Sequence, residues 1–333
     1  MTIRQDRLGL IKRRQLLLML GASGVATLAG CRRSDAAPHL IAPRGALPKA
    51  WGAALPDPWQ LSSATSVEQW EQMDRNGADL LAVSDGWLDA VSTVPLQPVA
   101  ADPLIGELDG QALRLMAGCG ELRRQVLPIA VSPWVILLRR DPRVTADVAE
   151  GWQLLLDPSL KGRVVLPDSP RLVISLADQL SGELSLKALR RQVLTFDDRQ
   201  ATNWLLKGDA RVAVLPLHRC AALLKRDPRF TAVLPSEGAP LHWIMLLRPQ
   251  STREPLPQAW VQEGWSGSLR RSLLQGGWRP PISSPLKQAV PASMRSLLFP
   301  PAAVWERCWS LPPLKEEARA ALLERSRRSA PAP

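Results

Sequence analysis

Three largely apolar runs of strand length, separated by helical patterns, most constrain how this 333-residue chain folds. The runs are 78–83, 163–166 and 211–215. Uninterrupted apolar runs are typical of strands that are covered on both faces, as in a parallel sheet. Because the predicted helices 171–181 and 197–207 alternate with these strands, the sequence predicts an α/β fold.

A longer apolar segment, residues 127–138, differs because Pro128 and Pro133 interrupt it. Proline has no backbone N–H to donate to a neighbouring strand. We therefore predict that this segment is a strand that passes between two lobes, rather than a central strand. A return strand is predicted at 243–247.

The first residues have the three parts of an export signal. Basic residues come first, an apolar run from Leu16 to Leu28 follows, and a Leu-Ala-Gly-Cys lipobox ends at Cys31. The apolar run is much shorter than the ~20 residues of a membrane-spanning helix. Residues 1–30 are therefore predicted to be a signal peptide that is cleaved.

Lipidation of Cys31 would hold the mature chain on a membrane surface, with residues 31–38 as the tether. The pair Arg13-Arg14 precedes the apolar run, as in a twin-arginine signal. Two export routes, the twin-arginine route and the general secretory route, stay open. Both place the protein outside the cytoplasm.

Charge gives no support to nucleic-acid binding. The whole chain has a net charge of +11, and residues 1–30 contribute five Lys or Arg and one Asp, so the rest carries +7. The arginines are dispersed and form no basic patch that alternates with aromatic residues. We therefore predict no nucleic-acid partner.

Aromatic usage is unusual, with 13 Trp, three Phe and no Tyr. A ligand site that would use Tyr in another protein must here use Trp or a non-aromatic residue. Trp offers one N–H donor and no acceptor, so it suits apolar or cationic ligand faces.

Besides Cys31, the chain has Cys119, Cys220 and Cys308, an odd number for an oxidising compartment. One disulfide with one free thiol is one alternative, and no disulfide is the other. There is no Cys-x-x-Cys pair, and we predict neither a metal site nor a cofactor.

Motifs of catalysis are missing from the sequence that follows the signal. It contains no Gly-x-Ser-x-Gly, no His-Glu-x-x-His and no glycine-rich loop that would hold a phosphate. With only three His in the chain, acid–base catalysis would depend on paired Asp or Glu, and no such pairing is evident. We do not expect an enzyme.

Four segments, in order along the chain, resemble the solute-binding proteins of ABC importers, in particular the spermidine/putrescine-binding type. They are 78–87 (ADLLAVSDGW), 151–164 (GWQLLLDPSLKGRV), 207–214 (KGDARVAV) and 235–243 (PSEGAPLHW). The second segment is similar to the family's W-x-x-L-x-D-P-x-x-K-G-K-V stretch and is the most specific of the four.

The resemblance implies the type II periplasmic binding protein fold. Two lobes, each a mainly parallel sheet flanked by helices, would be joined by crossing strands. Lobe 1 is expected at 39–133 and 246–315, lobe 2 at 134–245, and a C-terminal tail at 316–333. A ligand would be held between the lobes, which close around it.

The candidate ligand-binding residues are Arg44, Ser84, Asp85, Trp87, Asp168, Ser169 and Trp243. Most of them follow the ends of predicted strands, where an open α/β sheet binds ligands. Each has a second interpretation. Asp85 can pair with a ligand amine or cap a turn, the tryptophans can be pocket walls or core, and Arg44 can hold an anion or be solvated.

Polyamine-binding members of this family surround ammonium groups with carboxylates, because a buried cation must be paired. This chain has Ser169 and Leu172 at two positions where acids are expected, and Ile244 or Met245 at a third. Three alternatives for the ligand therefore stay open. It can be a polyamine, an anionic or neutral solute, or a ligand that reaches this chain through another protein.

The resemblance implies a lipid-anchored, monomeric substrate-binding protein that captures a small solute, nominally a polyamine, and delivers it to an ABC permease in the membrane. The chemistry would be reversible capture, without a bond made or broken. The alternative is a lipid-tethered scaffold or assembly protein that kept the fold but lost polyamine binding.

Overall fold

The computed structural model describes residues 37–75, 77–91, 93–140, 148–180, 185–283 and 290–329, the first three residues of the fourth range by their backbone alone. The predicted signal peptide and Cys31 lie outside these residues. Within them, no helix is both long and apolar enough to cross a membrane.

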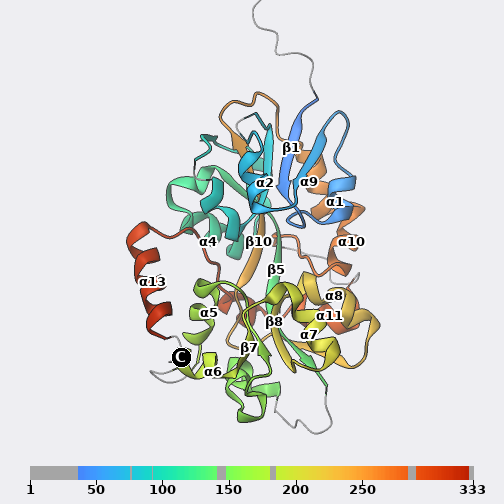
Figure 1. Cartoon of the computed structure of the whole chain (residues 1–333). Helices are drawn as coiled ribbons and strands as arrows, with labels where there is room; N and C mark the ends of the chain where they lie inside the picture. Colours follow the sequence, from blue (N-terminus) through green and yellow to red (C-terminus); the bar gives the residue numbers. More distant parts are fainter. Residues whose placement is uncertain are drawn as a thin grey trace, which may run out of the picture. The chain divides into compact units, whose positions relative to one another are not determined.

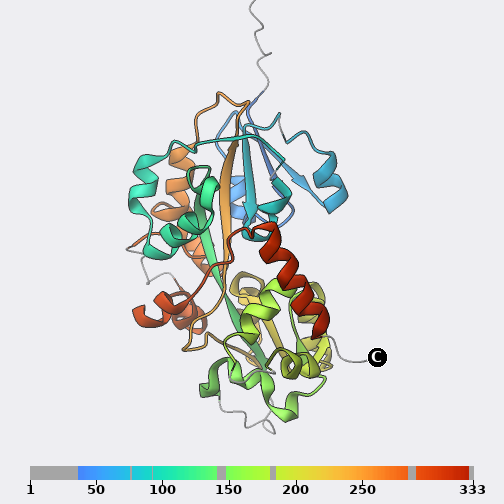
Figure 2. The ribbon, with the colours of Figure 1, turned by 90° about the vertical axis from the view of Figure 1, so that its left-hand side faces the viewer.

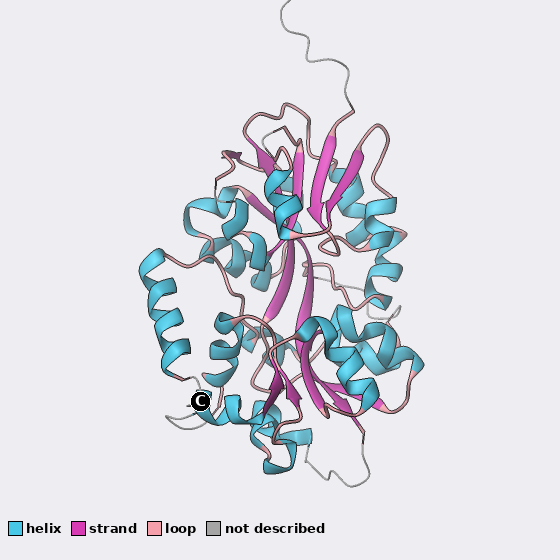
Figure 3. Ribbon diagram, viewed as in Figure 1, coloured by secondary structure: helices cyan, strands magenta, loops and turns pink. Residues whose placement is uncertain are grey.

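Ten strands of the described chain form one mixed sheet flanked by helices (Figures 1 and 3). The strands are β1 (His39–Pro43), β2 (Gln60–Ala64), β3 (Leu80–Ser84), β4 (Leu96–Gln97), β5 (Val126–Arg139), β6 (Val164–Val165), β7 (Val193–Thr195), β8 (Val212–Pro216), β9 (Phe230–Val233) and β10 (Leu241–Pro249). Their order is β2-β1-β3-β10-β5-β8-β6-β7, with β4 paired to β10 and β9 paired to β5.

Two groups of strands meet at β5 and β10. We call β1 to β4 the first half of the sheet and β6 to β9 the second half. Residues 126–133 of β5 pair with β10, and residues 134–139 pair with β8 and β9. Neighbouring strands within each half are parallel (β1 with β2 and β3, β6 with β7 and β8), whereas β5 and β10 are antiparallel to their partners. The predicted α/β architecture with crossing strands is confirmed, and the exact lobe boundaries stay a prediction.

The two prolines of β5 lie in the part that pairs with β10. Pro128 is opposite Met245, next to a register shift between Ile244 and Met245, and Pro133 is opposite Leu241. Because proline has no N–H to donate to the neighbouring strand, strand pairing is often irregular where proline occurs. The strand nevertheless continues past both prolines into the second half of the sheet.

Thirteen α-helices of the described residues surround the sheet. They are α1 (Lys49–Ala53), α2 (Val67–Gln72), α3 (Asp102–Glu107), α4 (Gly110–Gly118), α5 (Pro170–Ala177), α6 (Ser185–Gln192), α7 (Ala201–Lys207), α8 (Leu217–Arg226), α9 (Gln258–Trp265), α10 (Leu269–Gln275), α11 (Ala292–Leu298), α12 (Ala302–Arg307) and α13 (Glu316–Arg328). Short 3-10 segments are η1 (Asp85–Trp87), η2 (Asp89–Val91), η3 (Gly120–Arg124), η4 (Val148–Leu156), η5 (Pro158–Leu160) and η6 (Asp198–Gln200). Ser66 caps α2, because its hydroxyl accepts the N–H of Gln69.

Tryptophans fill much of the core, and most of their buried N–H groups have an acceptor there, whereas those of Trp70 and Trp204 have none within the described residues. The indoles of Trp51 and Trp260 each donate to the other residue's carbonyl, at 3.1 and 2.9 Å, and pack with ring centroids 5.6 Å apart. Trp265 donates to Ile129 on β5. For these three indoles, backbone carbonyls supply the acceptor that a buried N–H group needs.

The three cysteines of the described chain are free and buried. Of the two alternatives left open, the structure shows the one without a disulfide among Cys119, Cys220 and Cys308. Burial raises the pKa of the Cys220 thiol to about 12 and that of the other two to about 11. These thiols are therefore protonated and unreactive at neutral pH.

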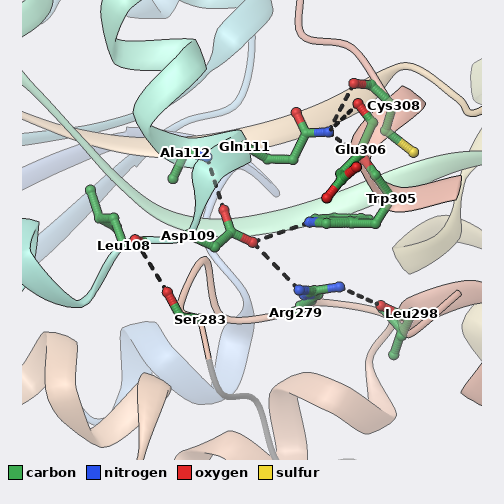
Figure 4. Close-up of polar contacts among 10 residues, drawn as sticks. All are labelled: Leu108, Asp109, Gln111, Ala112, Arg279, Ser283, Leu298, Trp305, Glu306 and Cys308. Carbon is green, nitrogen blue, oxygen red and sulfur yellow. Dashed lines mark hydrogen bonds and ion pairs between the residues drawn. The ribbon is translucent and has the colours of Figure 1, made fainter. Parts of the chain in front are cut away.

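A buried polar network fixes the chain where α12 ends (Figure 4). Arg279 lies with its guanidinium 3.9 Å from the ring centroid of Trp305 and 3.4 Å from the carboxylate of Asp109, which also accepts the Trp305 indole N–H. The Gln111 amide donates to the carbonyls of Trp305 and Cys308. Burial lowers the pKa of Arg279 to about 10, which Asp109 opposes. This network sets the position from which the C-terminal segment continues.

Candidate functional site

A cavity of about 570 Å³ lies between the end of β3, the N-terminus of α5 and the C-terminal residues 311–323. The first half of the sheet contributes residues from Ser84 to Asp89, and the second half contributes 167–172 and Asp198. Trp134 of β5 and His242 of β10 lie between them. The site is thus built from both halves at strand ends and has the size of a small-solute pocket.

Asp85 is the most enclosed carboxylate of this cavity. It begins η1 directly after β3, and its side chain is 9% exposed. Its Oδ1 accepts the backbone N–H of Trp243 at 3.3 Å and lies 3.3 Å from Nδ1 of His242. The pairing of Ser84 with Ile244 brings this turn beside β10. Within the described chain, no arginine forms an ion pair with Asp85, so its charge can still serve a ligand cation.

Asp168 faces the same cavity from the second half of the sheet. It precedes α5, whose first turn is capped by Ser169, because the Ser169 hydroxyl accepts the N–H of Leu172 at 3.3 Å. Asp168 is exposed, and its carboxylate has no hydrogen bond or ion pair within the described residues. Its neighbour in the lining, Asp198, is already engaged by the guanidinium of Arg219.

Two arginines bring positive charge to the lining. Arg319 of α13 lies 2.8 Å from the carboxylate of Asp89. Arg171, the second residue of α5, donates to the carbonyl of Pro312. Burial lowers the pKa of Arg171, and the nearby carboxylates of Asp89 and Asp85 oppose that effect. The cavity therefore holds acids and bases together, and within the described residues no arginine forms an ion pair with Asp85 or Asp168, although the charge of Arg171 lies close enough to interact with Asp85.

Aromatic rings border the acids. Trp87 packs edge-on against Trp70, with centroids 5.5 Å apart, and Trp134 packs edge-on against His242 at 6.4 Å. Indole faces attract cations through the ring quadrupole. Carboxylates with adjacent indoles can bind a small organic cation. Within the described residues, no three His, Cys, Asp or Glu side chains are grouped so that they could hold a metal ion.

The structure brings together five of the seven residues that the sequence nominated. Ser84, Asp85, Trp87, Asp168 and Ser169 line the cavity. The other two do not belong to its lining. The Trp243 side chain is fully buried and donates to the hydroxyl of Ser310, so only its backbone reaches Asp85. Arg44 is exposed at the turn after β1, where its N–H donates to the carbonyl of Ala64.

Sequence reasoning missed His242, Asp89, Asp198, Trp134 and Arg319. A signal existed for His242. Side chains alternate between the two faces of a strand, so a buried Trp243 places His242 on the opposite face. The other four carry no local signal, because they reach the cavity from 3-10 segments, a long strand and a distant helix. The acids expected at Leu172 and at Ile244 or Met245 are absent, and Asp89 and Asp198 enter the lining from elsewhere.

Solved structures of other proteins share this fold. A spermidine/putrescine ABC transporter substrate-binding protein of Streptococcus pneumoniae superposes with a TM-score of 0.67 at 12% identity, over 88% of this chain and 98% of that one. The TpPotD lipoprotein of Treponema pallidum gives 0.60 at 13%, over 87% and 98%. The fold is that of a type II periplasmic binding protein. No protein-family model and no curated protein matches the chain.

Proteins of this fold bind chemically different ligands. A ferric binding protein of Campylobacter jejuni also matches, with a TM-score of 0.60 at 13% identity over 87% of this chain and 99% of that one. The fold therefore does not fix the ligand. The side chains of the cavity must decide it.

Proposed function

We propose that this chain is the substrate-binding protein of an ABC importer and captures a small solute in the cavity between the two halves of the sheet. The observation that carries the proposal is the cavity itself. It lies at strand ends, is lined from both halves, and has the volume of a small-molecule site. Solved structures that share the fold include ABC substrate-binding proteins.

The solute that best fits the lining is an organic cation, with a polyamine as the first compound to test. Asp85 is nearly enclosed and forms no ion pair with an arginine within the described chain, and the carboxylate of Asp168 has no hydrogen bond or ion pair there. Trp87 and Trp134 offer aromatic faces close to these acids. The ligand-binding residues that we propose are Ser84, Asp85, Trp87, Asp168 and Ser169, with Trp134 and His242 added.

Delivery to a membrane permease is part of the same proposal. The lipobox at Cys31 supports a lipid-anchored location outside the cytoplasm, and a protein of this fold from Treponema pallidum is a lipoprotein. A single lipidated chain, working as a monomer, would present its cavity to the permease from the membrane surface.

Thermal unfolding with added solutes tests the proposal. Spermidine or putrescine at about 100 times its dissociation constant should raise the free energy of unfolding by roughly 2.7 kcal/mol. The shift should disappear in Asp85→Asn and shrink in Asp168→Asn. The matched control is Asp227→Asn, whose carboxylate pairs with Arg229 outside the cavity lining.

Three other outcomes would count against this assignment. An equal spermidine shift in Asp85→Asn and in the control would place the ligand elsewhere. A shift with glutamate or another anion, but not with amines, would reverse the proposed ligand charge. No shift with any amine, amino acid, sugar or organic anion would favour the scaffold alternative.

A further inference from the structure

The C-terminal helix α13 borders the cavity and contacts residues of both halves. Figure 2 shows this helix, in red, on the face turned to the viewer. Arg319, Leu322 and Leu323 contribute to the cavity lining. Their spacing places them on one face of the helix, because residues three and four apart are neighbours on its surface. The sequence reads as a charged tail, and none of its helical residues is buried.

One end of α13 is tied to the first half of the sheet and the other end to the second half. Near its start, Arg319 pairs with Asp89 of η2. Near its end, both terminal nitrogens of Arg325 contact the carboxylate of Asp178, at 2.5 and 3.2 Å. Arg190 of α6 donates to the carbonyl of Ser326 at 2.9 Å. The helix therefore bridges the two halves beside the ligand cavity.

The chain before α13 is held differently. The Trp309 backbone exchanges hydrogen bonds with Ala239 and Leu241, and Ser310 accepts the buried indole of Trp243. Pro312 accepts the guanidinium of Arg171. These contacts involve backbone or buried groups. Two of the contacts of α13, by contrast, are ion pairs whose side chains are 41 to 48% exposed, and exposed ion pairs are weak in water. The third contact is Arg190, which donates to the carbonyl of Ser326 and to the hydroxyl of Ser329 at the end of the helix.

From this contrast we infer that α13 is a lid over the ligand cavity, hinged at residues 311–315 and latched by Arg319–Asp89 and Arg325–Asp178. The inference rests on the proposed function in one respect, since it takes the cavity to be the ligand site. Opening releases the two exposed latches and the Arg190 hydrogen bonds at the end of the helix, and leaves the Pro312 anchor in place.

Amide hydrogen exchange tests the lid without any ligand. The double variant Arg319→Glu and Arg325→Glu puts like charges at both latches. We expect amides of 84–88 and 168–172 to exchange about tenfold faster, because exchange of covered amides follows the population of the open form. The matched control is Arg327→Glu and Arg328→Glu, which makes the same charge change in the same helix. Those arginines contact Glu324 of α13 itself and not the cavity.

Equal amide exchange rates at 84–88 and 168–172 in the two double variants would overturn the inference. The helix α13 would then be a fixed part of the cavity lining. Urea unfolding of each variant must show unchanged global stability. If the glutamates prevent folding, Arg319→Gln with Arg325→Gln gives the same comparison without charge reversal. Stopped-flow binding of spermidine should also be faster in the latch variant than in the control. Absence of spermidine binding in every variant would refute the proposed ligand, whereas the exchange result would still decide the lid.

Discussion

At the scale of single residues, His218 shows how burial fixes a charge state. Its ring stacks on Trp278 with centroids 4.1 Å apart and on His242 at 5.1 Å. Its Nδ1 has no hydrogen-bond partner within the described residues. Burial lowers the pKa of His218 well below its usual value, and the nearby His242 and Arg219 add smaller contributions in the same direction. The imidazole is therefore neutral in the folded protein at neutral pH.

This burial predicts that acid destabilises the protein. Below about pH 6.5, His218 is protonated in the unfolded chain but stays neutral in the folded chain. The free energy of unfolding therefore falls as the pH falls, by up to about 1.4 kcal/mol per pH unit. Urea unfolding between pH 7.5 and 5 should show this slope, and His218→Phe should lose most of it. His39→Gln is the control. An unchanged slope in His218→Phe would assign the acid sensitivity to other groups.

Site residues were predictable where the local sequence sets their position. Ser84 ends β3, Asp85 follows it directly, and Asp168 comes three residues after β6, and strand ends are where such sheets bind ligands. Trp243 was nominated by its motif, but a motif does not say which face of a strand a side chain takes. Arg319 is 234 residues beyond Asp85, and only the folded chain brings the two to one cavity.

At the scale of elements, the segment around Gly238 depends on a backbone that only glycine adopts easily. Gly238 has φ of +95°, and a Cβ there would lie 2.4 Å from the carbonyl oxygen of Arg307. Its own carbonyl accepts the buried indole of Trp152 at 2.8 Å. The turn therefore joins the 151–164 motif, the chain before β10 and the end of α12.

Replacing this glycine should be costly. Gly238→Ala combines a strained backbone with a steric clash, and we expect a loss of about 1–3 kcal/mol or more in the free energy of unfolding. Gly106→Ala in α3 is the control, because nothing lies within 4 Å of a Cβ there and its φ is ordinary. The midpoints of urea unfolding measure the stability of both variants. Equal midpoints would mean that the backbone near Gly238 adjusts freely.

Secondary structure was predicted well where one local pattern decides it. The strands predicted at the apolar runs 78–83 and 211–215 are observed as β3 (Leu80–Ser84) and β8 (Val212–Pro216). The role of α13 was not predicted, because its charges are typical of a solvated helix. Its ion pairs join it to residues more than 140 positions away, and no local pattern reports such partners.

At the scale of the whole molecule, the stretches of the described chain that link the two halves of the sheet include β5, β10 and the C-terminal segment that runs from α12 to α13. The pairing of β5 with β10 is irregular at Ile244 and Met245. Such irregular positions can absorb a rotation between the halves, whereas the buried sheet on either side cannot. A ligand that contacts Asp85 and Asp168 together would favour the closed arrangement.

Distance measurements between spin labels should detect that closure. Leu113→Cys on α4 and Lys187→Cys on α6 place exposed labels on the two halves, in a chain where Cys31 is replaced by Ser. The native thiols are buried, with raised pKa values, and should not react. Saturating spermidine should move the distance distribution to shorter values, because only a closed cavity lets both acids reach one cation. Asp85→Asn should keep the ligand-free distribution. If spermidine binds but leaves the distance distribution unchanged, the solute is held without movement of the two halves. The proposed delivery to a permease would then need another signal that the solute is bound.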